Sequence, residues 1–456
     1  MSEKKTLAKD LTKGSVSKTL LMFAWPVMLS NLLQTAYNMI DMVIVGRFSG
    51  SAGLSAVSTG GDILHFYTFI SMGFATAGQI MISQYVGAGK KDELNGVIGT
   101  LFTFVLSLGL VLMILSFIFA EPFLHLLNVP AEAYEGARAY ILCCSAGMMF
   151  IFGYNTVSAA LRGMGDSKHP MIFIGIAAIL NTILDLFFIS SLHMGAFGAA
   201  LATVIAQGLS FILSIIYLYQ NREAFGFDFK PSSFRPVKGP TVTLLKLGVP
   251  IAIQHSAGSI SALFVSSYIN SYGVVASAVT GVGNKMNSIA LIVANALNTS
   301  GSSVIGQCFG AGNTKRVKSV VGHVFCFDLI FVSILAVIIL NFPEQVFGIF
   351  NSDAAVLEMS HIYAPVAAIA FIGYAFRSPC LAFINGLGNS KMNFLMGVVE
   401  GFVLRIGLCI LLGVTFGFGI QGFWYGSTVA SYGYGMVIFP YFFSNVWTKR
   451  KTVVSR

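Results

Sequence analysis

The chain alternates long apolar stretches with short polar ones, and this pattern predicts membrane-spanning helices. A helix that crosses a bilayer needs about 20 predominantly apolar residues. Charged and turn-forming residues divide the sequence into twelve stretches of this kind. We therefore predict an all-α integral membrane protein with spans at residues 19–46, 57–84, 96–119, 137–161, 170–190, 195–219, 243–270, 281–305, 318–341, 361–384, 393–414 and 419–446.

The composition agrees with this interpretation. Apolar residues make up 55% of the 456 residues, and charged residues only 10%. A soluble domain carries about a quarter charged residues, so a large soluble domain is excluded. The residues left over between twelve spans are too few for a catalytic domain outside the membrane.

The positive charges predict the orientation. The net charge is +9, and the Lys and Arg residues lie in short segments between the apolar stretches. If the N-terminus is cytoplasmic, nearly all of them fall on the cytoplasmic side, with Arg47, Arg138 and Lys285 on the other. Positively charged loops stay in the cytoplasm, so we expect a multi-pass protein of the cell membrane with both termini cytoplasmic. No basic stripe faces one way, so nucleic-acid binding is not expected.

The two halves of the chain repeat each other. The motif "GAGKK" after the second span matches "GAGNTK" after the eighth, and "GMGDSK" after the fourth matches "GLGNSK" after the tenth. The matches occur in the same order and at the same sequence separation, which indicates two pseudo-symmetric six-helix lobes. The predicted parts are a cytoplasmic N-terminal tail, an N-terminal lobe, a cytoplasmic linker, a C-terminal lobe and a cytoplasmic C-terminal tail, at residues 1–18, 19–219, 220–242, 243–446 and 447–456.

The first span carries a polar stripe. Gln34, Tyr37, Asn38 and Asp41 are spaced by three and four residues, which places them on one face of a helix. An ionisable side chain in the hydrocarbon layer is costly. This face is therefore expected to line a cavity or to pack against another polar face.

The fifth span offers such a face, because Asn181 and Asp185 are four residues apart. Asp41 and Asp185 both lie near the outer ends of their spans, at similar depth. Two carboxylates in one site of low dielectric do not both ionise easily, so one can hold a proton near neutral pH. The same oxygens, with the hydroxyl of Thr203 on the sixth span, also suit a Na⁺ ion. A polar network that only holds helices together is the alternative.

The second half lacks these acids, since Val265 and Leu408 stand at the corresponding positions. A site present in one half only favours a role in ion coupling over symmetric packing. The second half has other intramembrane charges. For Asp328, Arg377 and Arg405 we expect an internal ion pair, such as Asp328 with Arg405, that stabilises the second bundle. A charge that contacts substrate and a charge that snorkels to the membrane surface are the alternatives.

Two further residues of the second half are ionisable. Glu400 lies nine residues past Lys391 and is expected to reach the cytoplasmic interface, and His255 is expected to be a hydrogen-bonded core residue. The sequence contains no ATPase motif, and its scattered cysteines suggest neither a zinc site nor a disulfide framework. We therefore predict a protein that is not an enzyme, needs no cofactor and takes its energy from an ion gradient.

Several motifs resemble one transporter family. "QTAYNMIDMVIVG" in the first span, "LRGMGDSK" after the fourth, "LNTILD" in the fifth and "GAFGAALAT" in the sixth are similar to the multidrug and toxic compound extrusion (MATE) transporters. The resemblance extends over nearly the whole chain and is strongest to the prokaryotic branch related to DinF. It implies antiport, in which H⁺ or Na⁺ enters while an organic, often cationic, compound leaves.

The resemblance also implies roles for particular residues. Asp41, Asn181, Asp185 and Thr203 would form the cation site, with Na⁺ as one candidate ion. Gln34, Tyr37 and Asn155, together with Asn38 from the polar stripe, would border the substrate cavity. The NorM-type branch has acids in its seventh and tenth spans. Gly258 and Tyr374 stand there in this chain, so a second cation site is not expected.

Other functions remain as alternatives. A lipid-linked oligosaccharide flippase of the same superfamily often has fourteen spans and a strongly cationic cavity, which the sequence does not match. A channel needs a continuous polar pore lining, and a membrane enzyme needs a richer set of His, Asp or Ser. We therefore expect a monomeric antiporter in the lipid bilayer that exports small organic substrates by alternating access.

Overall fold

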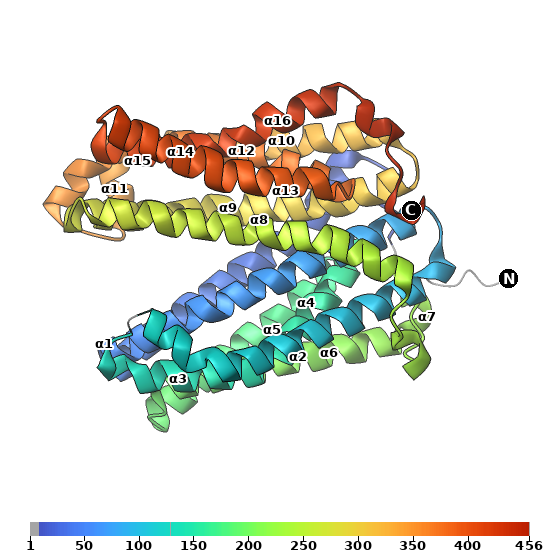
Figure 1. Cartoon of the computed structure of the whole chain (residues 1–456), viewed down its shortest axis with the longest axis horizontal. Coiled ribbons are helices and arrows are strands. Elements are labelled where there is room, and N and C mark those ends of the chain that lie inside the picture. Colours follow the sequence, from blue (N-terminus) through green and yellow to red (C-terminus); the bar gives the residue numbers. More distant parts are fainter. Residues whose placement is uncertain (1–8, 128, 456) are drawn as a thin grey trace. The chain divides into compact units, whose positions relative to one another are not determined.

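The computed structural model describes residues 9–127 and 129–455. Residues 1–8 of the predicted N-terminal tail and Arg456 of the C-terminal tail lie outside the described residues. Across the described part of the chain there are only helices and turns, with no strand. The α-helices (Figure 1) are α1 (Val16–Gly87), α2 (Leu94–Leu126), α3 (Ala131–Ala146), α4 (Met148–Gly163), α5 (Lys168–Asp185), α6 (Gly195–Gln220), α7 (Arg222–Phe225), α8 (Lys238–Asn270), α9 (Val274–Gly310), α10 (Thr314–Asn341), α11 (Pro343–Gly348), α12 (Ala354–Gly386), α13 (Ser390–Val398), α14 (Gly407–Ile410), α15 (Gly419–Val429) and α16 (Gly433–Phe443).

These helices supply the predicted spans. Within the described residues, nine helices are long and apolar enough to cross a membrane, and the pair α3 and α4, bent by 50°, makes a tenth span. Helix α1 contains two predicted spans, because the backbone at Gly50 (φ 65°, ψ −164°) leaves the helical region between them. The last predicted span is divided into α15, a 3-10 turn at Ala430–Tyr432 and α16. The predicted all-α membrane fold is thereby confirmed.

The internal repeat is visible in the backbone. Gly89 and Gly312 follow α1 and α9 with φ of 71° and 72°, and Gly165 and Gly388 follow α4 and α12 with φ of 87° and 63°. Glycine adopts a positive φ at little steric cost, so these positions allow the chain to leave a helix sharply. The repeated glycine motifs in the sequence therefore correspond to repeated turns.

The chain forms two units. The first, which we call the first lobe, contains residues 9–10 and 25–252, and the second lobe contains residues 11–24 and 253–455. In the first lobe α6 packs on α3, α4 and α5, and α2 packs on α3 and α4; in the second, α12 packs on α9, α10 and α15. The helices of each lobe run side by side (Figure 1). The domain limits drawn from the sequence remain predictions.

The predicted linker is packed against α2 rather than extended. Phe102 of α2 stacks on Phe227, with the ring centres 6.0 Å apart. Thr103 Oγ1 donates a hydrogen bond to the carbonyl of Phe234 at 2.5 Å. Gly99 permits the linker backbone to approach α2 closely, because a Cβ at position 99 would lie 1.8 Å from the carbonyl oxygen of Ser233.

Residues 11–14 are tied to the second lobe by one arginine. The guanidinium of Arg316 on α10 donates hydrogen bonds to the carbonyls of Leu11, Lys13 and Gly14 at 3.2, 2.8 and 2.7 Å. Leu11 donates its own N–H to Gln307 Oε1 at 3.0 Å, and its side chain belongs to the buried apolar cluster of this lobe. The start of α1 is therefore anchored by both polar and apolar contacts.

Candidate functional site

The polar stripe of the first span lies on α1 of the first lobe. Tyr37 and Asp41 are buried, with 9% and 8% of their surface exposed, whereas Gln34 and Asn38 are exposed. Each pair is related by four residues, as the helical period requires. The stripe therefore has a buried edge and an exposed edge.

A small, closely packed pocket, which we call the first-lobe cavity, adjoins the buried edge. Its polar lining comes from three helices: Tyr37 of α1, Asn181 of α5, and Thr203 and Gln207 of α6. Gln207 Nε2 donates to the hydroxyl of Tyr37 at 3.5 Å. The remaining lining residues are the alanines at positions 177 and 206. The structure thus brings together three of the predicted residues.

Gln207 was missed by the sequence analysis, although a signal for it exists. It follows Thr203 by four residues on α6, so the two share one helix face. It is buried at 7% exposure, with its amide next to the cavity. The same i, i+4 argument that linked Asn181 to Asp185 therefore applies here.

The two predicted acids are both buried. Asp41 is 8% exposed and Asp185 is fully buried at the last position of α5. They are near enough for the charge of Asp41 to act on Asp185, and both charges act on Tyr37. Among the described residues, no Lys, Arg or His nitrogen lies within 4 Å of either carboxylate. The charges of this pair are therefore not neutralised by a basic side chain.

Several polar atoms in this region have no hydrogen-bond partner among the described residues. They are Oδ1 of Asp41, both side-chain oxygens of Asp185 and both polar side-chain atoms of Asn181. Buried polar groups are normally paired, and each exception needs an explanation. Carboxylate oxygens without protein donors can take up a proton or, with an amide oxygen, coordinate a hard cation. The arrangement is suited to binding a small cation.

The backbone changes just after Asp185. Residues Leu186–Ser191 form a π-helical turn between α5 and the loop to α6. Such turns occur frequently at functional sites. Here the turn begins directly next to the buried carboxylate.

Other predicted cavity residues are placed differently. Asn155 of α4 is half-buried, and neither it nor the exposed Gln34 and Asn38 belongs to the cavity lining. Asp41 and Asp185 each follow a lining residue by four positions, but neither acid is itself part of the lining. In the described part of the chain, no cluster of three or more His, Cys, Asp or Glu side chains could hold a metal ion. The roles assigned to these residues remain predictions.

The ion pair expected in the second lobe was wrong. Arg405 is paired with Glu400 through its Nη2 atom, and its Nη1 donates to the carbonyl of Gly258 at 3.4 Å. Glu400 is 3% exposed, so its carboxylate lies inside the lobe and not on the protein surface. Asp328 is fully buried on α10, and its two oxygens have no hydrogen-bond partner among the described residues.

The remaining charged residue of this lobe lies against an aromatic ring. The guanidinium carbon of Arg377 on α12 is 5.4 Å from the ring centre of Tyr434, in cation–π geometry. The electrostatic field of Arg377 reaches His255 on α8. Tyr374 lies one helical turn before Arg377, and both residues line a second pocket, which lies in the second lobe between α9 and α12. The second lobe thus holds two buried acids and two partly buried arginines, whereas the polar site of the first lobe holds two acids.

Comparisons with known proteins identify the family. The MatE family model matches residues 26–187 and again residues 250–411. The probable multidrug resistance protein YpnP of Bacillus subtilis is 33% identical over 315 residues, covering 68% of this chain and 69% of that protein. The probable multidrug resistance protein YoeA of the same organism is 26% identical and covers 99% of this chain and 98% of its own length.

Solved structures share the fold. A structure described as the outward-facing conformation of a multidrug resistance MATE family transporter aligns with a TM-score of 0.91 and 21% identity, over 98% of this chain and all of that one. The double match of the family model also agrees with the repeat of six spans read from the sequence. The chain therefore belongs to the MatE family, whose members are membrane transporters and not enzymes.

Proposed function

We propose that this protein is a cation-coupled antiporter that exports small organic compounds, with H⁺ or Na⁺ moving inward. Its relatives are named as multidrug resistance proteins, which supports organic, often cationic, drugs or toxic metabolites as the exported class. Transport would proceed by alternating access, in which the substrate is exposed to one side of the membrane at a time. The distribution of Lys and Arg supports a cytoplasmic location for both termini.

One observation carries the proposal. Asp41 and Asp185 are buried in the first lobe without a basic partner and have unpaired oxygens, and the unpaired amide of Asn181 lies one helical turn before Asp185 on α5. A pair that served packing alone would need donors for these oxygens, because an unsatisfied buried group costs about 1–3 kcal/mol. The second repeat has Val265 and Leu408 instead of the two acids, so the shared fold does not require them.

The chemistry of the pair suggests how coupling works. With both carboxylates ionised, the two negative charges repel each other in a region of low dielectric. A proton or Na⁺ removes this repulsion, so the pair has two states of different charge. Tyr37, Thr203 and Gln207 line the first-lobe cavity, and in this proposal they contribute to the substrate surface near the group that changes state. Occupation of one site by a cation would then disfavour a cationic substrate at the other.

The test is transport by purified protein in proteoliposomes, with H⁺ and Na⁺ gradients imposed separately. A cationic dye should accumulate against its gradient with at least one of the two ions, and the ion should flow in the opposite direction. Dye movement that follows only its own gradient would indicate a channel or a uniporter and contradict the proposal.

Substitution locates the coupling. Asp41→Asn and Asp185→Asn keep the side-chain volume and remove the charge that changes state. Each should abolish gradient-driven accumulation, and the double variant should be no worse than either single one, because both changes disable one unit. Equilibrium dye binding should persist. The matched control is Asp328→Asn, which neutralises a buried acid of the second lobe and should leave coupling intact.

A further inference from the structure

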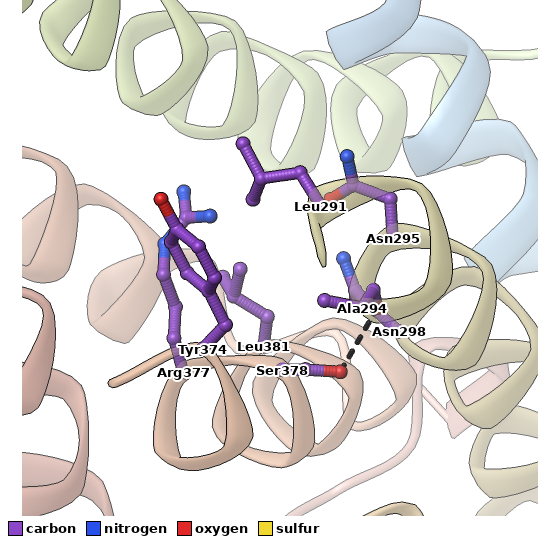
Figure 2. A pocket seen from close by; sticks show the side chains of 8 residues that line it. All are labelled: Leu291, Ala294, Asn295, Asn298, Tyr374, Arg377, Ser378 and Leu381. Carbon is purple, nitrogen blue, oxygen red and sulfur yellow. Dashed lines mark hydrogen bonds between the residues drawn. The ribbon is translucent and has the colours of Figure 1, made fainter. Parts of the chain in front are cut away.

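The second lobe contains a small pocket between α9 and α12 (Figure 2). Its polar lining consists of two side-chain amides, two hydroxyl groups and one guanidinium, contributed by Asn295, Asn298, Tyr374, Ser378 and Arg377. Figure 2 shows Arg377 and Tyr374 on one side of this space and the two asparagines on the other. No predicted coupling residue belongs to the cavity.

The charge of Arg377 has no carboxylate partner. Among the described residues, no Asp or Glu oxygen lies within 4 Å of its guanidinium. Glu400, whose charge reaches Arg377, is already paired with Arg405. Two guanidinium groups therefore share one carboxylate, and the surplus positive charge remains at Arg377. The face of Tyr434 stabilises this charge without neutralising it.

The guanidinium also has unused hydrogen-bonding capacity. Its Nε atom is buried and has no hydrogen-bond partner among the described residues. Arginine presents its donors in a planar fork that matches a carboxylate or a phosphate. An arginine with a buried, free Nε–H donor can therefore bind an oxyanion.

The neighbouring side chains add donors rather than acceptors. The hydroxyl of Ser302 donates to the backbone carbonyl of Asn298 at 2.8 Å, and the side-chain amide nitrogen of Asn298 can donate to a ligand. Ser378 donates its hydroxyl hydrogen to the carbonyl of Ala294 at 3.0 Å, as drawn in Figure 2. Arg377, the Tyr374 hydroxyl and the two asparagine amides remain as donors to an incoming group.

From this arrangement we propose that the cavity between α9 and α12 binds the carboxylate of an organic substrate, with Arg377 as its counter-ion. The protein would then accept zwitterionic or acidic organic compounds in addition to purely cationic ones. Leu291 and Leu381 line the same cavity and provide apolar contacts for the carbon skeleton next to the carboxylate. This inference rests on the proposed function, because it takes the bound compound to be a transported substrate. Its test measures binding without any ion gradient.

The experiment compares two ligands that differ only at the carboxylate. One is a rhodamine dye with a free benzoate and the other is the methyl ester of the same dye, so both carry the same cationic ring system. Fluorescence polarisation measures the dissociation constant of each dye with the full-length protein in detergent. We expect the acid to bind more tightly than the ester, because a charge-assisted hydrogen bond is about twice as strong as a neutral one.

Variants assign the difference to the cavity. Arg377→Gln should weaken binding of the acid about tenfold or more and leave the ester within about twofold, whereas Arg377→Lys should retain part of the preference. Asn298→Leu removes the side-chain amide donor and leaves the contact of Arg377 with Tyr434 in place. It should also lower the affinity for the acid dye selectively, so the proposal can be tested even if Arg377→Gln fails to fold. Thermal unfolding confirms the fold of each variant.

Three outcomes would overturn the proposal. The first is that the wild-type protein binds the acid and the ester with equal affinity. The second is that Arg377→Gln and Asn298→Leu lower the affinity for both dyes to the same extent. The third is that a short-chain phosphatidate displaces both dyes equally, and does so only when Arg377 is present. The last result would assign the cavity to a lipid phosphate. Because no gradient is used, failure of ion coupling in proteoliposomes would leave these binding results unaffected.

Discussion

Replacing Asp185 by leucine should stabilise the protein and abolish coupled transport. The side chain is fully buried, and its two oxygens have no hydrogen-bond partner among the described residues. The second repeat has Leu408 at the corresponding position of its eleventh span, so the helix of the other repeat carries a leucine there, in a half-buried environment. A buried group without partners costs about 1–3 kcal/mol, and the added methyl groups contribute apolar burial of about 0.8 kcal/mol for each CH₂.

Crowding around the larger side chain offsets part of this gain, since overpacking costs about 1–3 kcal/mol. A net stabilisation of about 2 kcal/mol therefore follows for Asp185→Leu. In a folding unit of roughly 200 residues, this raises the unfolding midpoint by about 4–8 °C. The gain would illustrate a functional group kept at the expense of stability.

The assay is thermal unfolding in detergent, followed by the reaction of buried thiols with a fluorogenic maleimide. All six cysteines are free, and Cys144 of α3 is buried in the first lobe. The matched control is the reverse exchange, Leu408→Asp, which introduces an unpaired carboxylate into a half-buried position and should lower the midpoint. An Asp185→Leu midpoint below that of the wild type would refute the reasoning, because the carboxylate would then have stabilising partners and serve packing.

Two further predictions concern the linker on α2. Gly99→Ala should detach the linker from α2, because the new Cβ would lie 1.8 Å from a linker carbonyl, and limited proteolysis of the linker should then be faster. Gly322 is a helical glycine with open space around it, so the control Gly322→Ala should leave the rate of proteolysis unchanged. The hydroxyl of Ser233 donates to Asp228 and holds the pKa of this carboxyl below its ordinary value. This contact stabilises the linker at neutral pH and is lost as the pH falls through the lowered pKa, so pepsin cleavage should begin at a higher pH in Ser233→Ala than in the wild type. If wild type and Ser233→Ala showed the same pH dependence of pepsin cleavage, the stabilising role of this contact would be contradicted.

The sequence predicted the spans because each apolar stretch matches the thickness of a bilayer. The repeated turns were also predictable, since Gly89 and Gly312 need a positive φ that few other residues adopt. The packing of the linker was not predictable. Its polar composition and prolines indicate a loop, but only the three-dimensional structure shows that Gly99 allows the backbone of the linker to touch α2.

The wrong ion pair in the second lobe has a geometric cause. Glu400 and Arg405 are five residues apart, which on an α-helix separates two side chains by about 140° around the axis. The structure has a π-helix at Val399–Ile406, whose wider turn brings residues five apart onto one face. A pattern based on the α-helical period therefore could not pair these residues.

The first-lobe cavity was only partly predictable for a different reason. The i, i+4 spacing identified the polar faces of α1 and α5 correctly, since Tyr37 and Asn181 line one cavity. Which polar residues of a face are buried depends on how neighbouring helices cover it. Gln34 and Asn38 belong to the same stripe as Tyr37 and are exposed, a difference that no periodicity contains.

The two repeats share their turns but not their charges, and this separates two kinds of constraint. Asp41 and Asp185 correspond to Val265 and Leu408, while Arg377 corresponds to Tyr154. Because each charged position is neutral in the other repeat, the duplicated fold forms without any of these charges. The acids of the first lobe and the arginine of the second are therefore independent additions of opposite sign. Substitutions in the first lobe should alter ion dependence, and those at Arg377 should alter which substrates bind.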